Sequence, residues 1–155
     1  MKELNRKVIE EIFRKIEEYY GIKIDKEIIK KYRFFSTKEK IYMFNKNFPD
    51  FLDEKYVKKY GLYIIKIEKN NYRFSIEGAQ IFGIDAEKVI EIEKEKIFYK
   101  NEEKIIIDKE NGYYIAKDKN DILGSVFIKN KELKDFIPKE RKIVYNLTKD
   151  KPENT

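Results

Sequence analysis

Asp50, Asp53 and Lys55 form a spacing in this sequence that could support hydrolytic chemistry. In a metal-dependent nuclease, two carboxylates bind Mg²⁺ and a lysine polarises the phosphate. Such carboxylates must converge from paired strands, whereas these two lie close together at the predicted start of a short helix. Acidic side chains there stabilise the helix through its dipole. We therefore rank a Mg²⁺ nuclease last among the functions considered.

The residue types that are missing exclude most other chemistry. The chain has 155 residues and no His, Cys or Trp. Zinc and copper sites, thiol nucleophiles, disulfides and histidine-based triads all need His or Cys. The six glycines form neither a phosphate loop nor a dinucleotide fingerprint. We expect no enzyme, no cofactor and no metal site.

Charge is distributed unevenly along the chain. There are 35 basic and 29 acidic residues, a net charge of +6. The excess lies in residues 1–80, whereas the remainder is neutral. Within the neutral part, residues 129–142 have six basic side chains against three acidic ones. Such a stretch either contacts phosphates or is a solvated loop, and charge alone does not choose between them.

A strand with alternating aromatic residues is a second candidate for binding nucleic acid, with less support than residues 129–142. Tyr72 and Phe74 flank Arg73 and alternate along a predicted strand, so they share a face. Exposed aromatics beside a basic residue can stack on unpaired bases. With 12 Tyr and 11 Phe in the chain, the alternative that these are core residues is the favoured one.

The elements that must position these residues follow from apolar periodicity and turn residues. Val8, Ile9, Ile12, Phe13 and Ile16 predict an amphipathic helix that ends at Gly21. Next we predict a helix at 24–32, a hairpin at 34–44, a helix closed by Gly61, strands at 62–67 and 72–76, and a helix at 77–82. Short strands follow at 89–92, 105–107, 113–116, 123–128 and 143–145, as in a small barrel or sandwich.

The fold class expected is α+β, with an N-terminal antiparallel sheet and flanking helices followed by a small β-barrel. We place a domain boundary near Gly83, giving domains of residues 1–84 and 85–155. The apolar runs are too short to span a membrane, and no hydrophobic signal core opens the chain. We expect a cytoplasmic protein whose Lys-, Glu- and Ile-rich composition is thermophile-like.

Read in order, several segments resemble the Nip-seven family of ribosome-biogenesis factors, in an archaeal-type form. The matching segments are Phe13–Ile16 with Tyr20-Gly21, then 33–45, 55–65, 72–79, 98–101, 112–115 with 122–124, and 143–147 with Asp150. The chain departs from the family pattern at Lys100, at Ile122 and in the tail from Lys151 to Asn154.

The resemblance implies a PUA-like RNA-binding β-barrel at residues 85–155 and a role in large-subunit assembly and pre-rRNA processing without catalysis. The family's RNA contact lies just before the last PUA strand, which here corresponds to Lys139, Arg141 and Lys142, with Lys134 nearby. Arg73, Tyr72 and Phe74 remain the secondary candidates. The expected partners are pre-rRNA or rRNA, together with assembly proteins that bind the N-terminal domain.

The alternative function is a protein-interaction adaptor. In that case the N-terminal domain docks onto another assembly or RNA-processing factor, and contact with RNA is incidental. Lys139, Arg141 and Lys142 would then matter less than the apolar surface of that domain.

Overall fold

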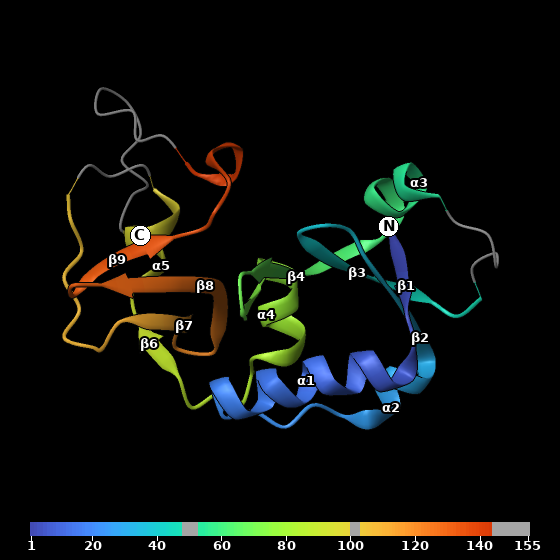
Figure 1. Ribbon diagram of the computed structural model, residues 1–155. Coiled ribbons are helices and arrows are strands. Elements are labelled where there is room, and N and C mark those ends of the chain that lie inside the picture. The colour runs from blue at the N-terminus through green and yellow to red at the C-terminus, as the bar shows by residue number, and fades with distance from the viewer. Residues whose placement is uncertain (48–52, 100–102, 144–155) are drawn as a thin grey trace.

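Two β-sheets lie side by side with one helix between them in the computed structural model, which describes residues 1–47, 53–99 and 103–143 (Figure 1). The first sheet is antiparallel throughout, in the order β1-β2-β3-β4-β5. Its strands are β1 (Lys2–Leu4), β2 (Tyr32–Ser36), β3 (Lys40–Asn45), β4 (Leu62–Glu68) and β5 (Asn71–Phe74).

Helices cover both faces of the first sheet. Helix α1 (Arg6–Tyr20) lies along one face, with α2 (Lys26–Lys31) beside it, and α3 (Glu54–Tyr60) lies on the opposite face (Figure 1). Asn5 caps α1 by accepting a hydrogen bond from the Val8 N–H, and Gly21 ends it with φ of 65°. Ile9, Ile12, Phe13 and Ile16 are buried on the sheet, as their spacing predicts, whereas Val8 is exposed.

The second sheet has the order β6-β7-β8-β9, with β6 and β7 parallel and the other pairs antiparallel. Its strands are β6 (Val89–Glu91), β7 (Gly112–Asp118), β8 (Asp121–Lys129) and β9 (Glu132–Asp135). The helix α5 (Lys94–Phe98) follows β6, and the 3₁₀ turn η1 (Lys139–Arg141) follows β9.

The small β-barrel expected for the second half of the chain does not close over the part that the structure describes, which corrects the sequence prediction. Among the described residues the second sheet stays open, because the segment at 105–107 makes one isolated bridge, Ile106 with Glu132, in place of the predicted strand. Ile106 is also largely exposed, so burial adds little to its pairing. The pair β7–β8 does form the predicted hairpin, with its turn at residues 119–120.

Helix α4 (Ile76–Phe82) connects the two sheets (Figure 1). Its first residue, Ile76, belongs to the core of the second sheet, whereas Ala79 and Phe82 belong to the core of the first. Ser75 fixes its start: the Ser75 hydroxyl accepts from the Gly78 N–H at 2.9 Å and donates to the Tyr63 carbonyl at 2.7 Å. The helix is therefore held against β4 at its first turn.

Two glycines allow α4 to approach both sheets closely. A Cβ on Gly78 would overlap the carbonyl oxygen of Ile64 in β4. On the other side, Gly124 of β8 has φ of +129°, and a Cβ there would lie 3.2 Å from the Ile76 side chain. Backbone packs directly on the helix at both positions, which only glycine permits.

The main hydrophobic core crosses the predicted boundary at residues 84 and 85. Ile115 of β7 is fully buried in the same cluster as Phe13, Ile65 and Phe74 of the first half. The Tyr19 hydroxyl accepts from the Tyr113 N–H at 2.8 Å, which links α1 to β7. The division into two domains stays a prediction.

Most predicted elements of the first half are confirmed within a residue or two. The helix predicted at 77–82 begins at Ile76, which the sequence assigned to the preceding strand. In the second half, β9 and α5 were not predicted, and of the predicted strand at 143–145 only Ile143 is described, in a parallel bridge with Tyr99. No helix of the described residues is long and apolar enough to cross a membrane.

The variant Gly78→Ala should lower the free energy of unfolding by about 2 kcal/mol, because the added methyl group forces α4 away from β4. This loss outweighs the gain of about 1 kcal/mol in helix propensity. Urea unfolding measures the difference. Lys7→Ala, at an exposed position of α1, is the control and should change stability by about 0.5 kcal/mol at most. A Gly78→Ala variant as stable as wild type would contradict the close packing.

Burial raises the pKa of Tyr20 well above its usual range, and its hydroxyl donates to the Tyr72 carbonyl at 3.0 Å. The stability this group contributes is therefore fully present below about pH 10 and lost as pH rises further. Relative to Tyr20→Phe, wild type should lose about 1.4 kcal/mol per pH unit above that point. Urea unfolding from pH 8 to 11 tests this, with Tyr60→Phe, at a largely exposed ring, as the control that keeps the wild-type slope.

Candidate nucleic-acid interface

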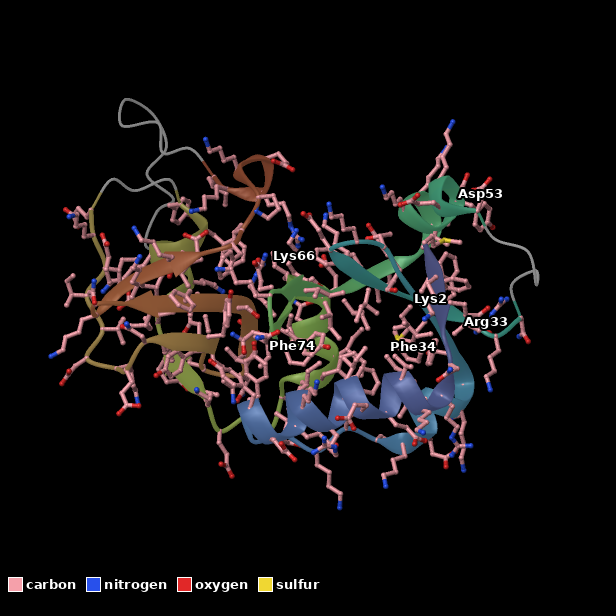
Figure 2. All side chains as sticks on the ribbon, viewed as in Figure 1. Lys2, Arg33, Phe34, Asp53, Lys66 and Phe74 are labelled. Atoms are coloured by element: carbon pink, nitrogen blue, oxygen red, sulfur yellow. The ribbon has the colours of Figure 1, made fainter. Side chains whose placement is uncertain are left out.

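The face of the first sheet that points away from α1 has basic and aromatic side chains. Phe34 and Phe74 point toward α1, whereas Lys66 lies on the opposite side of the sheet (Figure 2). We call Lys40, Tyr63, Lys66 and Arg73 the basic face. The strand alternation that buries Phe74 turns its neighbour Arg73 outward.

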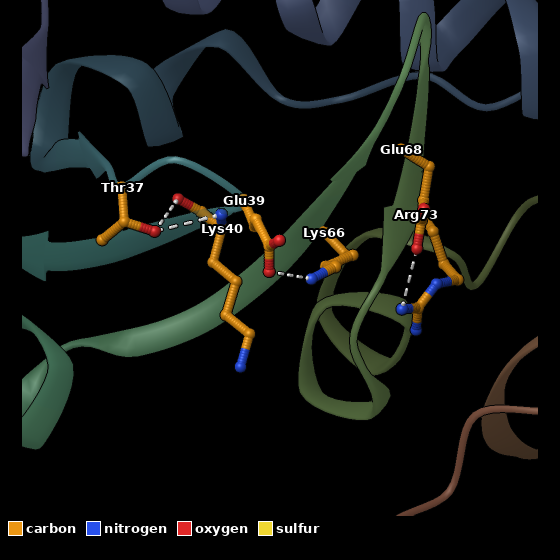
Figure 3. A network of polar contacts seen from close by, with 6 residues as sticks. All are labelled: Thr37, Glu39, Lys40, Lys66, Glu68 and Arg73. Atoms are coloured by element: carbon orange, nitrogen blue, oxygen red, sulfur yellow. Dashed lines mark hydrogen bonds and ion pairs between the residues drawn. The ribbon is translucent and has the colours of Figure 1, made fainter.

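Three cations of the basic face are direct cross-strand neighbours. Lys40 of β3 is paired in register with Lys66 of β4, and Lys66 with Arg73 of β5. Figure 3 shows these side chains on three adjacent strands. Like charges placed opposite one another destabilise a sheet unless something offsets them.

Two carboxylates and one ring offset this repulsion. Lys66 contacts Glu39 at 2.6 Å, and the Arg73 Nη2 atom lies 3.4 Å from Glu68 (Figure 3). The Lys40 ammonium lies 4.7 Å from the centre of the Tyr63 ring. Lys40 has no ion pair among the described residues, and Glu39, whose closest cation is Lys66, acts on the Lys40 charge only at longer range.

The environment also shifts the protonation of two neighbouring groups. The hydrogen bond from Lys66, helped by its charge, holds the pKa of the Glu39 carboxyl below its usual range. Burial raises the pKa of the Tyr63 hydroxyl, against the opposing effect of the nearby Arg73 charge. Glu39 therefore stays ionised and Tyr63 stays neutral at neutral pH.

The four basic residues predicted to contact RNA, Lys134, Lys139, Arg141 and Lys142, differ in exposure and in their carboxylate partners. Lys134, on β9, contacts Glu132 at 3.2 Å, and the half-buried Lys142 donates to Asp135 at 2.8 Å. Arg141 contacts Glu77 of α4 at 2.9 Å. Lys139 is exposed and has no ion pair among the described residues. Three of the four predicted contacts therefore already have carboxylate partners.

The tertiary structure brings the two predicted sites together. Arg73, from the secondary site, and Arg141, from the primary one, line a single cavity of about 100 Å³. Tyr63 of the basic face lines the same cavity, and so does Phe136, whose ring centre lies 3.8 Å from the Arg73 guanidinium. The basic face and residues 136–141 are thus one continuous surface.

The aromatics that flank Arg73 pack toward the main core, although Phe74 also lines the cavity. Phe74 is 1% exposed in the main core, and Tyr72 packs against the same core. The core alternative is confirmed for Phe74, and Tyr72 is partly buried against the same core, while Arg73 occupies the opposite face of the strand. The aromatic rings next to Arg73 are those of Tyr63 and Phe136, which come from other elements.

Of the two acids and the lysine considered for a nuclease, Asp50, Asp53 and Lys55, Asp53 has a structural role. Asp53 caps α3 by accepting a hydrogen bond from the Tyr56 N–H at 2.7 Å. Lys55 lies exposed on that helix, and Asp50 is outside the described residues. Over the described ranges, no group of three or more carboxylates is placed to hold a metal ion.

Lys40 and Lys66 are the residues that sequence reasoning missed. Each occupies a strand position on the face opposite the buried isoleucines, so alternation alone could have marked them as outward-facing. Their adjacency depends on strand register, which includes an irregularity between Ile41 and Tyr42. A local pattern does not contain that information.

No protein-family model matches the chain, and no curated protein matches it either.

The variant Lys66→Met should raise the pKa of the Glu39 carboxyl toward its usual range, because the hydrogen bond that is the largest cause of its lowering is lost. Carbon-detected NMR titration of the glutamate side chains measures this shift. The stability that Glu39 contributes is present above its unfolded-state pKa and is lost as pH falls through the lower folded-state value. A Glu39 pKa unaltered in Lys66→Met would mean that the ion pair does not form in solution.

Proposed function

We propose that this protein is a non-enzymatic RNA-binding factor that contacts RNA phosphates through the basic face together with Lys139 and Arg141. The observation that carries the proposal is the convergence of Arg73 and Arg141 on one cavity, beside the cation row of Lys40 and Lys66. Cations from separate segments that gather on one surface are what phosphate binding requires.

The carboxylates on this surface are compatible with that role. Arg141 and Glu77 are both exposed, and an exposed ion pair is worth only about 0.2–1 kcal/mol, so a phosphate can replace Glu77 as the partner of Arg141 at small cost. Lys40 and Lys139 need no such exchange, because neither has an ion pair among the described residues. The net attraction is modest, which predicts weak binding that depends on salt.

Tyr63 and Phe136 add a feature suited to RNA in particular. Both rings lie beside guanidinium or ammonium groups on the basic face. A ring next to a cation can contact a base while the cation contacts its phosphate. Phe136 is 36% exposed, so part of its ring is accessible.

The role in large-subunit assembly and pre-rRNA processing, in the cytoplasm, is part of the proposal and rests on the resemblance to the Nip-seven family. So does the assignment of the second sheet as a PUA-like module. The antiparallel pairing of β7 with β8 supports that assignment, because the segments at 112–115 and 122–124 resemble a PUA strand pair.

Salt-dependent binding of a short oligouridylate and a matched stem–loop, followed by fluorescence anisotropy, tests the proposal. The variants Lys40→Gln/Lys66→Gln and Lys139→Gln/Arg141→Gln should each weaken binding to both RNAs. Each should also reduce the slope of log affinity against log salt by about 1.4, since about 0.7 is lost per cation on a single strand.

The matched control is Lys7→Gln/Lys15→Gln, which removes the same charge from exposed positions of α1 on the other side of the sheet. It should keep the wild-type salt slope. Equal affinities for wild type and both face variants at every salt concentration would overturn the proposal. Protein partners that remain bound after nuclease treatment would then favour the adaptor function.

A further inference from the structure

Two residues that line the cavity between the two sheets each have a buried hydrogen-bonding atom without a partner in the described part of the chain. Arg73 Nε and Ser125 Oγ are the buried side-chain atoms of the described residues that have no hydrogen bond, and both residues line this cavity. Ser125 is 5% exposed, and the Arg73 side chain is 11% exposed. An unsatisfied buried polar group costs about 1–3 kcal/mol, so two in residues that line one small cavity require an explanation.

We propose that this cavity binds a phosphoryl group, with Arg73, Ser125 and Arg141 as its hydrogen-bond donors. Each of the three comes from a different element: β5, β8 and η1. The site therefore exists only when the two sheets are packed together.

The donor set selects the chemistry of the ligand. The guanidinium groups of Arg73 and Arg141 can only donate, and the serine hydroxyl rotates freely enough to donate as well. Arg73 uses Nη2 toward Glu68, which leaves its Nε–H, and Arg141 uses Nη1 toward Glu77, which leaves its remaining N–H groups. A ligand that satisfies them must be rich in acceptors and negatively charged, as an oxyanion is.

The dimensions and the walls of the cavity narrow the choice further. A volume of about 100 Å³ equals that of about three water molecules at the ~30 Å³ each occupies in the liquid. That is enough for a single tetrahedral oxyanion. Phe136, Ile137 and Pro138 form an apolar wall that strengthens charge-assisted hydrogen bonds by excluding water.

Opposing charges near the cavity make the expected affinity weak. Glu68 and Glu77 already accept from the two arginines and repel an incoming anion. The phosphoryl group could come from free inorganic phosphate or from RNA. The RNA source rests on the proposed function, whereas binding of inorganic phosphate does not.

The Arg73 Nε–H resonance in a proton–nitrogen correlation spectrum reports directly on this site. Inorganic phosphate should shift that resonance in a saturable way, beyond the change given by chloride at matched ionic strength. Ser125→Ala should reduce the phosphate affinity several-fold. Arg73→Lys lacks the Nε–H reporter, so binding is followed through the backbone amides of residues 123–126, and their shifts should no longer saturate with phosphate. Ser36→Ala, at the end of β2 outside the cavity lining, should bind phosphate as wild type does.

A second arm separates the two sources of the phosphoryl group. An oligouridylate with a 5′-phosphate should compete with inorganic phosphate at the Arg73 resonance if RNA supplies the group, and its 5′-hydroxyl counterpart should compete less if the terminal phosphate is the one bound. If phosphate binds but neither oligonucleotide competes with it, the cavity binds free phosphate, and this inference is supported.

An Arg73 resonance that responds to phosphate no more than to chloride would overturn the inference, even if RNA binds elsewhere on the basic face. Conversely, saturable phosphate binding without any RNA binding would support the cavity and remove the proposed function. Circular dichroism and urea unfolding of each variant establish that a lost response is not a lost fold.

Discussion

The packing of α4 between the two sheets is the contact on which the rest of the molecule depends. Gly78 lets the helix meet the backbone of β4, and Gly124 lets β8 approach Ile76 from the other side. The Gly78 contact is with backbone, so no rotamer change can adjust it, and the positive φ of Gly124 likewise restricts that position to glycine. The helix thereby sets the separation of the sheets, and with it the distance between β5 and the segment after β9.

The candidate site is a consequence of that separation. Arg73 extends from the edge strand of the first sheet, and its guanidinium stacks on Phe136, which follows the last strand of the second. Arg141 reaches back across the same gap to Glu77 on α4. The interface between the sheets is therefore built from charges and rings as well as from the shared core, and its polar groups are the ones that remain incompletely satisfied.

Most cations on this surface form ion pairs with carboxylates, and few of those described lack such a partner. Lys66, Arg73 and Arg141 each have a carboxylate partner, so the net charge of +6 is not concentrated at the site. Such pairing keeps like charges tolerable on adjacent strands while the cations stay in place for an anion. A surface of this kind distinguishes ligands by geometry more than by bulk attraction.

The sequence by itself determined most elements of the first half, since apolar spacing, caps and glycines act within a few residues: α1 with its end at Gly21 and the hairpin of β2 and β3 are local in this sense. It did not predict β1, a short strand that forms by pairing with β2. It also identified Arg73 and Arg141, but as members of separate sites. Only the tertiary structure decided that they share a cavity with Ser125, that Lys40 and Lys66 stand beside Arg73, and that the second sheet stays open among the described residues. The reason is that strand register and the packing of α4 depend on contacts between residues far apart in the chain, and local periodicity contains no information about them.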